Sequence, residues 1–283
     1  MNATTDNNLA ARFRELSTRL EPRPTDTAPR LGTLSGIRAV LFDIYGTLVI
    51  SASGDIGLAG EQDEDSAFRT ALASVGIQGD DAGPEKLKAA IRAAHVVRKA
   101  EGVAYPEVDI LAIWSSTLGT KQGLEQLAVE YECRVNPVWP MPGLGEVLAE
   151  LHHRGLVLGI VSNAQFYTSL MLEAFLERPL PALGFDPDCC AFSYRLLEAK
   201  PSTRIYREAL VGLEEKHGIE AHEVLYVGND VRNDIWPASL VGCRTALFAG
   251  DARSLRLRED DPQCAGVEAD RVVTDLHQIP ELV

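Results

Sequence analysis

Several polar side chains stand at the ends of predicted strands or at the start of a predicted helix, and together their residue types could carry out a reaction. In chain order they are Asp43, the pair Ser162 and Asn163, Lys200, and the acidic pair Asp230 and Asp234. Asp43 follows an apolar run of strand length and precedes a turn at Gly46. In open α/β sheets the strands deliver their next residues to one rim, so we expect these side chains to share a crevice.

The chemistry that this set favours is phosphoryl transfer. Neighbouring carboxylates repel one another unless a hard cation lies between them, and Mg²⁺ is satisfied by a few carboxylates with carbonyls, waters and phosphate oxygens. A hydroxyl such as Ser162 and a lysine such as Lys200 could hold the remaining phosphate charge, and the lysine would also offset the charge of a carboxylate nucleophile. The residues therefore predict a metal-assisted reaction at Asp43.

Each of these residues also has a simpler explanation when it is taken alone. Asp43 could cap a helix, Ser162 and Asn163 would cap a helix in any fold, and Lys200 could be a solvated lysine before a proline. Asp230 and Asp234 could belong to an acidic surface turn. The functional interpretation gains weight because these groups converge on one predicted rim.

The elements that would position these residues alternate between strand and helix. Apolar runs at 39–42, 156–161, 224–228 and 245–248 predict buried strands, with a shorter one at 189–193. Helical patterns follow at 144–155, 201–213 and from Ser162 and Asn163, as caps, to Phe175. This alternation predicts an α/β fold with a parallel, doubly wound sheet.

Two other stretches differ from this alternation. Between 66 and 131 the apolar spacing is helical throughout, with a helix expected to begin at Pro106, and this predicts a helical module inserted after the first strand. The polar stretch 51–65 is expected to be a loop. Residues 1–36 are expected to form an arm that contains an amphipathic helix from Leu9 to Leu20.

Composition excludes several classes of protein. The 283 residues carry a net charge of -14, which argues against a nucleic-acid or anionic-membrane binder, and no apolar run is long enough to span a bilayer. No secretory signal is recognised at the N-terminus, so the cytoplasm is the expected compartment. Five cysteines without a CxxC pair predict reduced, mostly buried thiols, and the six histidines show no metal-ligand spacing. Nothing in the sequence indicates an oligomeric state.

Four motifs in order resemble those of the haloacid dehalogenase superfamily: Asp43-Ile44-Tyr45-Gly46-Thr47-Leu48, Val161-Ser162-Asn163, Lys200-Pro201 and Gly228-Asn229-Asp230-Val231-Arg232-Asn233-Asp234. The resemblance implies a Rossmann-like core at 37–51 and 139–283 with an inserted helical cap at 52–138. It implies that Asp43 is the nucleophile, that Ser162 and Asn163 bind the transferring group, and that Lys200 steadies it. Tyr45 and Thr47 would also contact the substrate. Mg²⁺ would be bound by Asp43, the carbonyl of Tyr45, and Asp230 or Asp234.

The resemblance implies a hydrolase, most often a phosphatase acting on a small phosphorylated metabolite. Tyr45 stands where phosphatases of this superfamily usually carry an acid-base aspartate, and a tyrosine there is similar to the 2-haloacid dehalogenase branch. Asn229 also replaces a common aspartate. We therefore rank a Mg²⁺-dependent phosphatase first and a metal-independent dehalogenase-like hydrolase second, with a non-enzymatic descendant third. The halide-binding arginine of dehalogenases has no match by motif; Arg69, Arg92 and Arg98 are candidates by residue type alone.

Overall fold

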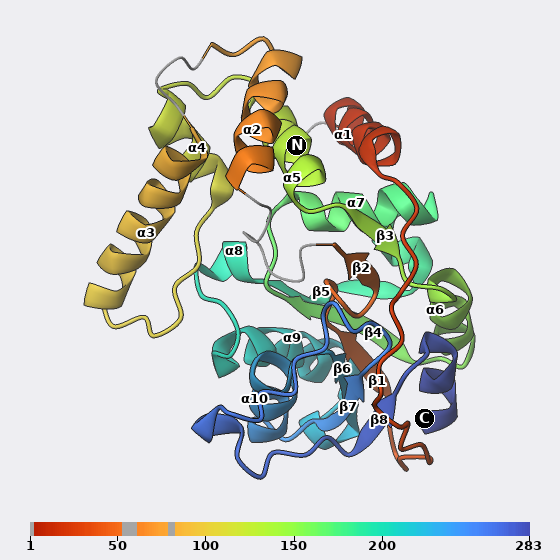
Figure 1. The fold of residues 1–283 in the computed structure, drawn as a ribbon. Helices are drawn as coiled ribbons and strands as arrows, with labels where there is room; N and C mark the ends of the chain where they lie inside the picture. Colours follow the sequence, from red (N-terminus) through yellow and green to blue (C-terminus); the bar gives the residue numbers. More distant parts are fainter. Residues whose placement is uncertain (1–2, 53–60, 79–82) are drawn as a thin grey trace.

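The computed structural model describes residues 3–52, 61–78 and 83–283, and its centre is a six-stranded sheet (Figure 1). The strand order is β5-β4-β1-β6-β7-β8, and every pair of neighbours is parallel. The strands are β1 (Ala39–Phe42), β4 (Val157–Ser162), β5 (Phe185–Phe192), β6 (Val224–Gly228), β7 (Arg244–Phe248) and β8 (Arg271–Val273). The predicted doubly wound, Rossmann-like α/β fold is confirmed.

The central strand β1 explains why the rim of the sheet is a site. From β1 the chain moves outward to β4 and β5 and then returns to the other side of β1 with β6. Such a reversal leaves a crevice at the carboxyl ends of the strands where it occurs. Because β1 pairs with both β4 and β6, the residues that follow these three strands meet at this crevice.

Helices cover both faces of the sheet, and the alternation of side chains along β1 divides the core between them. Val40 and Phe42 pack into the cluster that includes residues of α1, α6 and α7, whereas Ala39 and Leu41 pack with residues of α9 and α10. The helices are α1 (Ala3–Leu16), α6 (Leu144–His153), α7 (Tyr167–Leu176), α8 (Ser193–Leu196), α9 (Thr203–His217) and α10 (Trp236–Leu240). Shorter helical turns are η1 (Leu180–Leu183), η2 (Ala221–Glu223), η3 (Val231–Ile235), η4 (Pro262–Cys264) and η5 (Leu276–Leu282).

A separate group of helices lies above the sheet in Figure 1. It consists of α2 (Glu61–Ser74), α3 (Pro84–Ala100), α4 (Ile110–Leu118) and α5 (Leu124–Val135), and it is flanked by the short antiparallel pair β2 (Val49–Ser51) and β3 (Val138–Pro140). The buried ring of Trp114 lies 5.4 Å from Phe68 and 5.5 Å from Tyr131, centroid to centroid, and joins α4 to α2 and α5. Domain boundaries at 36, 52 and 138 stay predictions.

The N-terminal segment packs along the molecule. Phe13 of α1 is buried, with its ring 6.2 Å from that of Tyr167. The chain then runs down the right side of Figure 1 to β8, where Arg30 and Val272 form an antiparallel bridge. The helix ends at Leu16, four residues before the predicted end at Leu20. In the part of the chain that the structure describes, no helix is both long and apolar enough to cross a membrane.

Several local predictions were wrong, for identifiable reasons. The helix predicted from Pro106 begins at Ile110, because the side chain of Asp109 caps it by accepting from Leu111 N. Helix α7 begins at Tyr167, so Ser162 and Asn163 do not cap it. Of the predicted loop 51–65, Ser51 ends β2 and Glu61 begins α2, while 53–60 lie outside the described residues. The three-residue strands β2, β3 and β8 were missed, since such short strands have no visible periodicity.

Candidate active site

Asp43 lies directly after β1 and is buried in the crevice. Its backbone N–H donates to Val227 O on β6, which fixes the chain as it leaves the sheet. Its carboxylate Oδ1 accepts from Ser162 Oγ at 3.0 Å and from Lys200 Nζ at 2.6 Å. No side chain that the structure describes donates to Oδ2, so hydrogen bonds hold one oxygen of the Asp43 carboxylate and the other has no donor among the described residues.

The turn that follows Asp43 requires a glycine. Gly46 has a φ of +84°, and a Cβ there would lie 2.5 Å from Ser254 Cβ and 2.7 Å from Asn229 Nδ2. Around it, Thr47 Oγ1 donates to Asn229 Oδ1 at 3.1 Å, and Asn229 Nδ2 donates to Ser254 O at 2.6 Å. Thr47 is fully buried, so its hydroxyl ties the first motif to the last instead of facing an open crevice.

Lys200 is the centre of the buried polar network. Its Nζ lies 2.6 Å from Oδ1 of Asp43 and 2.6 Å from Oδ1 of Asp234. Its backbone N–H donates to Asn163 Oδ1 at 2.7 Å, so Asn163 positions the lysine through the main chain. Burial alone would lower the pKa of Lys200, but the two carboxylates outweigh it and raise the pKa above the usual value. The ammonium therefore stays charged.

The carboxylate of Asp234 accepts hydrogen bonds from two further groups besides Lys200. Its Oδ1 also lies 2.9 Å from the hydroxyl of Tyr226, and its Oδ2 accepts from the backbone N–H of Asp230 at 2.9 Å. Burial raises the pKa of Asp234 above the ordinary value for aspartate, against the opposing effect of Lys200. Tyr226, which is fully buried on β6, is a member of this site that sequence analysis missed.

Asp230 faces away from this network and toward Arg258. Its carboxylate accepts from Arg258 Nε at 3.0 Å and Nη2 at 2.6 Å, and it also accepts from Arg232 N, Asn233 N and Asn233 Nδ2. Five donors exceed the roughly four acceptor positions of a carboxylate, so Asp230 has none left for a metal ion. In the stretch 251–261, Asp251 is buried and Arg258 is part of this pair.

Tyr45 directs its hydroxyl to the helix α7. The hydroxyl lies 3.0 Å from Oγ1 of Thr168, which is fully buried. Burial, followed by the nearby charge of Glu132, raises the pKa of Tyr45 well above the usual value. The phenol therefore keeps its proton throughout the physiological range, and Thr168 is a second residue of the site that sequence analysis missed.

The segment before α4 ties the helical group to the site. Glu107 N–H donates to Leu197 O and Ala199 N–H donates to Tyr105 O, immediately before Lys200 in the chain. Gln165, two residues after Asn163, donates through Nε2 to Val108 O. Beside this contact lies a cavity of about 520 Å³. It is lined by apolar and aromatic side chains such as Leu87, Ile91, Trp114 and Tyr131, by the carboxyl groups of Glu107 and Glu132, and by the basic side chains Lys88, Arg92 and His95.

Comparison with known proteins decides the family. The family model described as haloacid dehalogenase-like hydrolase matches residues 37–242, which is most of the chain. The chain belongs to the haloacid dehalogenase-like hydrolases. This hydrolase is similar in fold to a 2-haloacid dehalogenase from Pseudomonas syringae, with 19% identity, a TM-score of 0.56, and coverage of 87% of this chain and 97% of that one. It is also similar to a HAD phosphatase from Thermococcus onnurineus, with 19% identity, a TM-score of 0.50 and the same coverage.

One relative is similar to this hydrolase in sequence over part of its length. It is the ribulose-1,5-bisphosphate 5-phosphatase of Halopiger xanaduensis, with 28% identity over 145 residues. The match spans 50% of this chain and 56% of the relative, so the hydrolase spans little more than half the length of that protein.

The structure brings together most of the residues that the sequence predicted for the site. Asp43, Ser162, Lys200 and Asp234 form one connected network at the rim. Asn163 adjoins it through the backbone of Lys200, and Thr47 and Tyr45 lie on the turn beside it. Asp230 is the exception, because Arg258 engages its carboxylate.

Proposed function

We propose that this hydrolase cleaves phosphate monoesters of small metabolites and that Asp43 attacks the phosphorus atom. The observation that carries the proposal is the asymmetry of the Asp43 carboxylate, whose Oδ1 is fixed by Ser162 and Lys200 while Oδ2 has no donor among the described residues. A fixed carboxylate with one free oxygen is a positioned nucleophile. Sequence similarity to a protein named as a phosphatase supports phosphorus over carbon as the atom attacked.

The donor atoms of the site fit Mg²⁺ if two carboxylates are enough. Asp43 Oδ2 accepts from no described residue, so one of its two acceptor positions is available for the ion and the other for attack on phosphorus, and Asp234 Oδ2 accepts one hydrogen bond and keeps one acceptor position. The Oδ1 atoms of both residues are 2.6 Å from Lys200 Nζ, so they lie within about twice that distance of each other. Mg²⁺ commonly uses one or two carboxylates with waters and substrate phosphate oxygens. Asp43, Asp234 and the carbonyl of Tyr45 would hold the ion; Asp230 would not.

The remaining residues have defined tasks in this reaction. When bound, Mg²⁺ would neutralise the negative charge that the phosphoryl group brings to the carboxylates. Lys200 offsets the charge on Asp43 before attack and holds a phosphoryl oxygen during transfer. The hydroxyl of Ser162 would donate a hydrogen bond to the transferring phosphoryl group. Attack by Asp43 would break the bond between phosphorus and the ester oxygen, which would leave as the alcohol after taking a proton from water. A second water molecule would then hydrolyse the aspartyl phosphate, which releases phosphate and regenerates Asp43. The leaving group would lie toward the 520 Å³ cavity next to Gln165.

A dehalogenase-like reaction is the second candidate, because two observations favour it. Tyr45 replaces an acid-base aspartate, and its phenol is engaged by Thr168. Arg258 forms an ion pair with the carboxylate of Asp230, which leaves fewer metal ligands in the acidic turn. In that reaction Asp43 would attack a carbon atom and displace halide without a metal ion.

One assay separates the two reactions. Purified protein is incubated with aryl phosphates, alkyl phosphates and 2-haloacids, each with Mg²⁺ or with a chelator, and released phosphate and halide are measured. The proposal expects Mg²⁺-dependent release of phosphate and none from Asp43→Asn. Halide release in the presence of chelator, without phosphate release, would transfer the function to the second candidate.

A further inference from the structure

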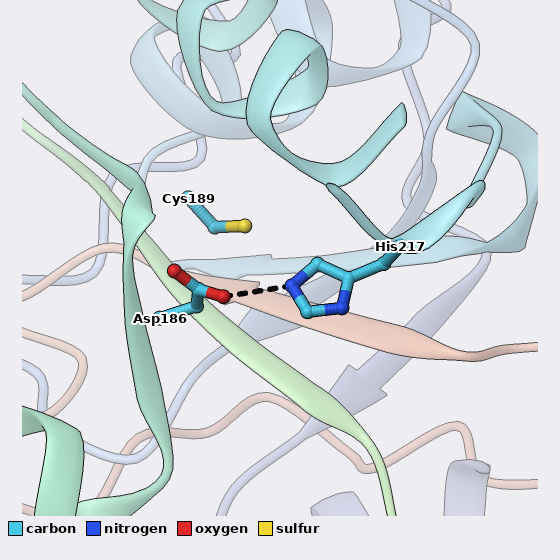
Figure 2. Close-up of side chains that lie close together, drawn as sticks. All are labelled: Asp186, Cys189 and His217. Carbon is cyan, nitrogen blue, oxygen red and sulfur yellow. Dashed lines mark hydrogen bonds and ion pairs between the residues drawn. The ribbon is translucent and has the colours of Figure 1, made fainter. Parts of the chain in front are cut away.

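A second group of ligand-type side chains lies on the edge strand β5 and at the end of α9, on the face of the sheet that α9 covers. Asp186 and Cys189 belong to β5, and His217 is the last residue of α9 (Figure 2). Helix α9 begins three residues after Lys200, and its 15 residues span about 22 Å. His217 is therefore remote from the rim where Asp43 lies, and Cys189 is separated from β1 by β4 and is buried on the α9 face of the sheet.

The three side chains offer a carboxylate, a thiol and an imidazole to one small space. Their ligand atoms all lie within 4.8 Å of one another, and His217 Nε2 is 2.7 Å from Asp186 Oδ2. Figure 2 shows the Cys189 sulfur on the same side of β5 as the Asp186–His217 pair. Cys189 is fully buried, and its thiol forms no hydrogen bond with any residue that the structure describes. The ligand atoms of a tetrahedral zinc ion lie roughly 3.3–3.8 Å apart, so closure of the group needs shifts of only about 1 Å.

Backbone packing around the group limits its freedom. A Cβ at Gly212 of α9 would lie 2.0 Å from Asp188 O, and a Cβ at Gly159 of β4 would lie 2.3 Å from Cys189 O. Glycines at these two positions let α9 and β4 press directly on the main chain of β5. The relative placement of Cys189 and His217 is therefore set by main-chain packing, which preorganises their side chains.

The charges of the group suit a divalent ion with soft-ligand preference. One carboxylate and one thiolate neutralise a 2+ charge, and the imidazole binds as a neutral ligand. Lys216 Nζ lies 2.9 Å from Asp186 Oδ1 and also 2.9 Å from Asp188 Oδ2, so it can remain on Asp188 while Asp186 Oδ2 binds the metal.

We propose that Asp186, Cys189 and His217 form a binding site for a zinc-class transition-metal ion that fastens the end of α9 to the start of β5. Three protein ligands leave the fourth tetrahedral position to water. The site is independent of the chemistry at Asp43, and Mg²⁺ does not compete for it because Mg²⁺ prefers oxygen ligands.

Co²⁺ is the probe that tests this site, since a thiolate bound to Co²⁺ gives a charge-transfer absorption in the near ultraviolet. The full chain is freed of metal with a chelator and titrated with Co²⁺ in excess Mg²⁺, which occupies oxygen-rich sites. We expect this absorption to saturate at one Co²⁺ per chain. Cys189→Ser abolishes it, and His217→Gln weakens Co²⁺ binding by at least about tenfold.

Cys190→Ser is the matched control, because Cys190 is the next residue of β5 but directs its thiol to Asp186 O instead of the group. This variant keeps the absorption and its stoichiometry. If Cys189→Ser does not fold, His217→Gln at the half-exposed end of α9 supplies the same measurement. No thiolate absorption in the parent, or an absorption that Cys189→Ser or His217→Gln leaves unchanged, overturns the proposal.

Discussion

The guanidinium of Arg258 binds the carboxylate of Asp230 with two hydrogen bonds, Nε to Oδ1 at 3.0 Å and Nη2 to Oδ2 at 2.6 Å. The two residues are 28 positions apart in the sequence. Their pairing gives the two aspartates of the acidic turn different roles. Asp230 serves the structure of the turn, whereas Asp234 faces Lys200 and Asp43. The two aspartates should therefore respond differently to the same substitution.

Asp234→Asn should weaken Mg²⁺ binding by at least about tenfold, because it removes one of the two carboxylates that fit the ion. Asp230→Asn should change Mg²⁺ affinity by less than about threefold, since its carboxylate has no acceptor position left. Isothermal titration calorimetry measures both. Equal losses in the two variants, or a larger loss in Asp230→Asn, would show that Asp230 does bind the metal.

Arg258→Gln should destabilise the protein without changing Mg²⁺ affinity. The substitution leaves a nearly buried carboxylate without its cation, at an expected cost of about 1–2 kcal/mol. The double variant with Asp230→Asn should cost less than the sum of the two single changes, because they remove the same interaction. Chemical denaturation gives these values, and strict additivity would argue against the pairing.

Tyr226→Phe should lower both stability and turnover. The hydroxyl lies 2.9 Å from Asp234 Oδ1 and 3.1 Å from Val161 O, and its loss from this buried position should cost about 1–2 kcal/mol. Because Lys200 Nζ lies 3.4 Å from the same hydroxyl, the lysine also loses a neighbour that restricts it. Tyr194→Phe, on a half-buried tyrosine outside the site, is the control and should change neither denaturation midpoint nor kcat. Unchanged midpoint and kcat in Tyr226→Phe would remove Tyr226 from the site.

The residues that the sequence predicted for the site and those that it did not predict are brought there by different parts of the fold. Asp43 and Asp234 follow buried strands and Ser162 ends one, and the apolar runs of these strands are visible in the sequence. Parallel strands bring their carboxyl ends to one rim whatever the rest of the chain does. Arg258 lies in a loop without periodicity, and only the folded chain brings it to Asp230. Tyr226 lies within the apolar run of β6. The apolar pattern predicts that its side chain is buried, but it does not indicate which residue its hydroxyl contacts.

Tyr45 should make turnover depend on the leaving group. A general acid contributes roughly 10²- to 10⁴-fold, and the phenol of Tyr45 is engaged with Thr168. Aryl phosphates, whose leaving anions need little protonation, should be hydrolysed measurably, and alkyl phosphates only weakly. Tyr45→Asp should raise kcat/KM mainly for alkyl phosphates, whereas Tyr45→Phe should leave aryl turnover within about threefold. A parent enzyme that prefers alkyl phosphates would mean that another residue supplies the proton.

Glu132 should make stability fall as pH rises. Burial raises its pKa in the folded protein above the usual value of 4.5, although hydrogen bonds from Asn136 and Tyr167 oppose the shift. Between the unfolded and folded pKa values the folded state binds more protons, so increasing pH there costs stability. Glu132→Gln removes this loss, and its melting temperature should rise relative to the parent between about pH 4.5 and the folded pKa, then level off. The exposed Glu208→Gln should show no such trend; an equal trend would exclude burial as the cause.

The most direct test of the central claim is to trap the covalent intermediate on Asp43. The enzyme is mixed with an aryl phosphate and Mg²⁺, quenched in acid within the first turnover, and its peptides are analysed by mass spectrometry. We predict a phosphoryl group on the carboxylate of Asp43, its absence in Asp43→Asn, and its accumulation when hydrolysis of the intermediate is slow. A phosphorylated residue other than Asp43, or phosphate release by Asp43→Asn at the rate of the parent, would contradict it.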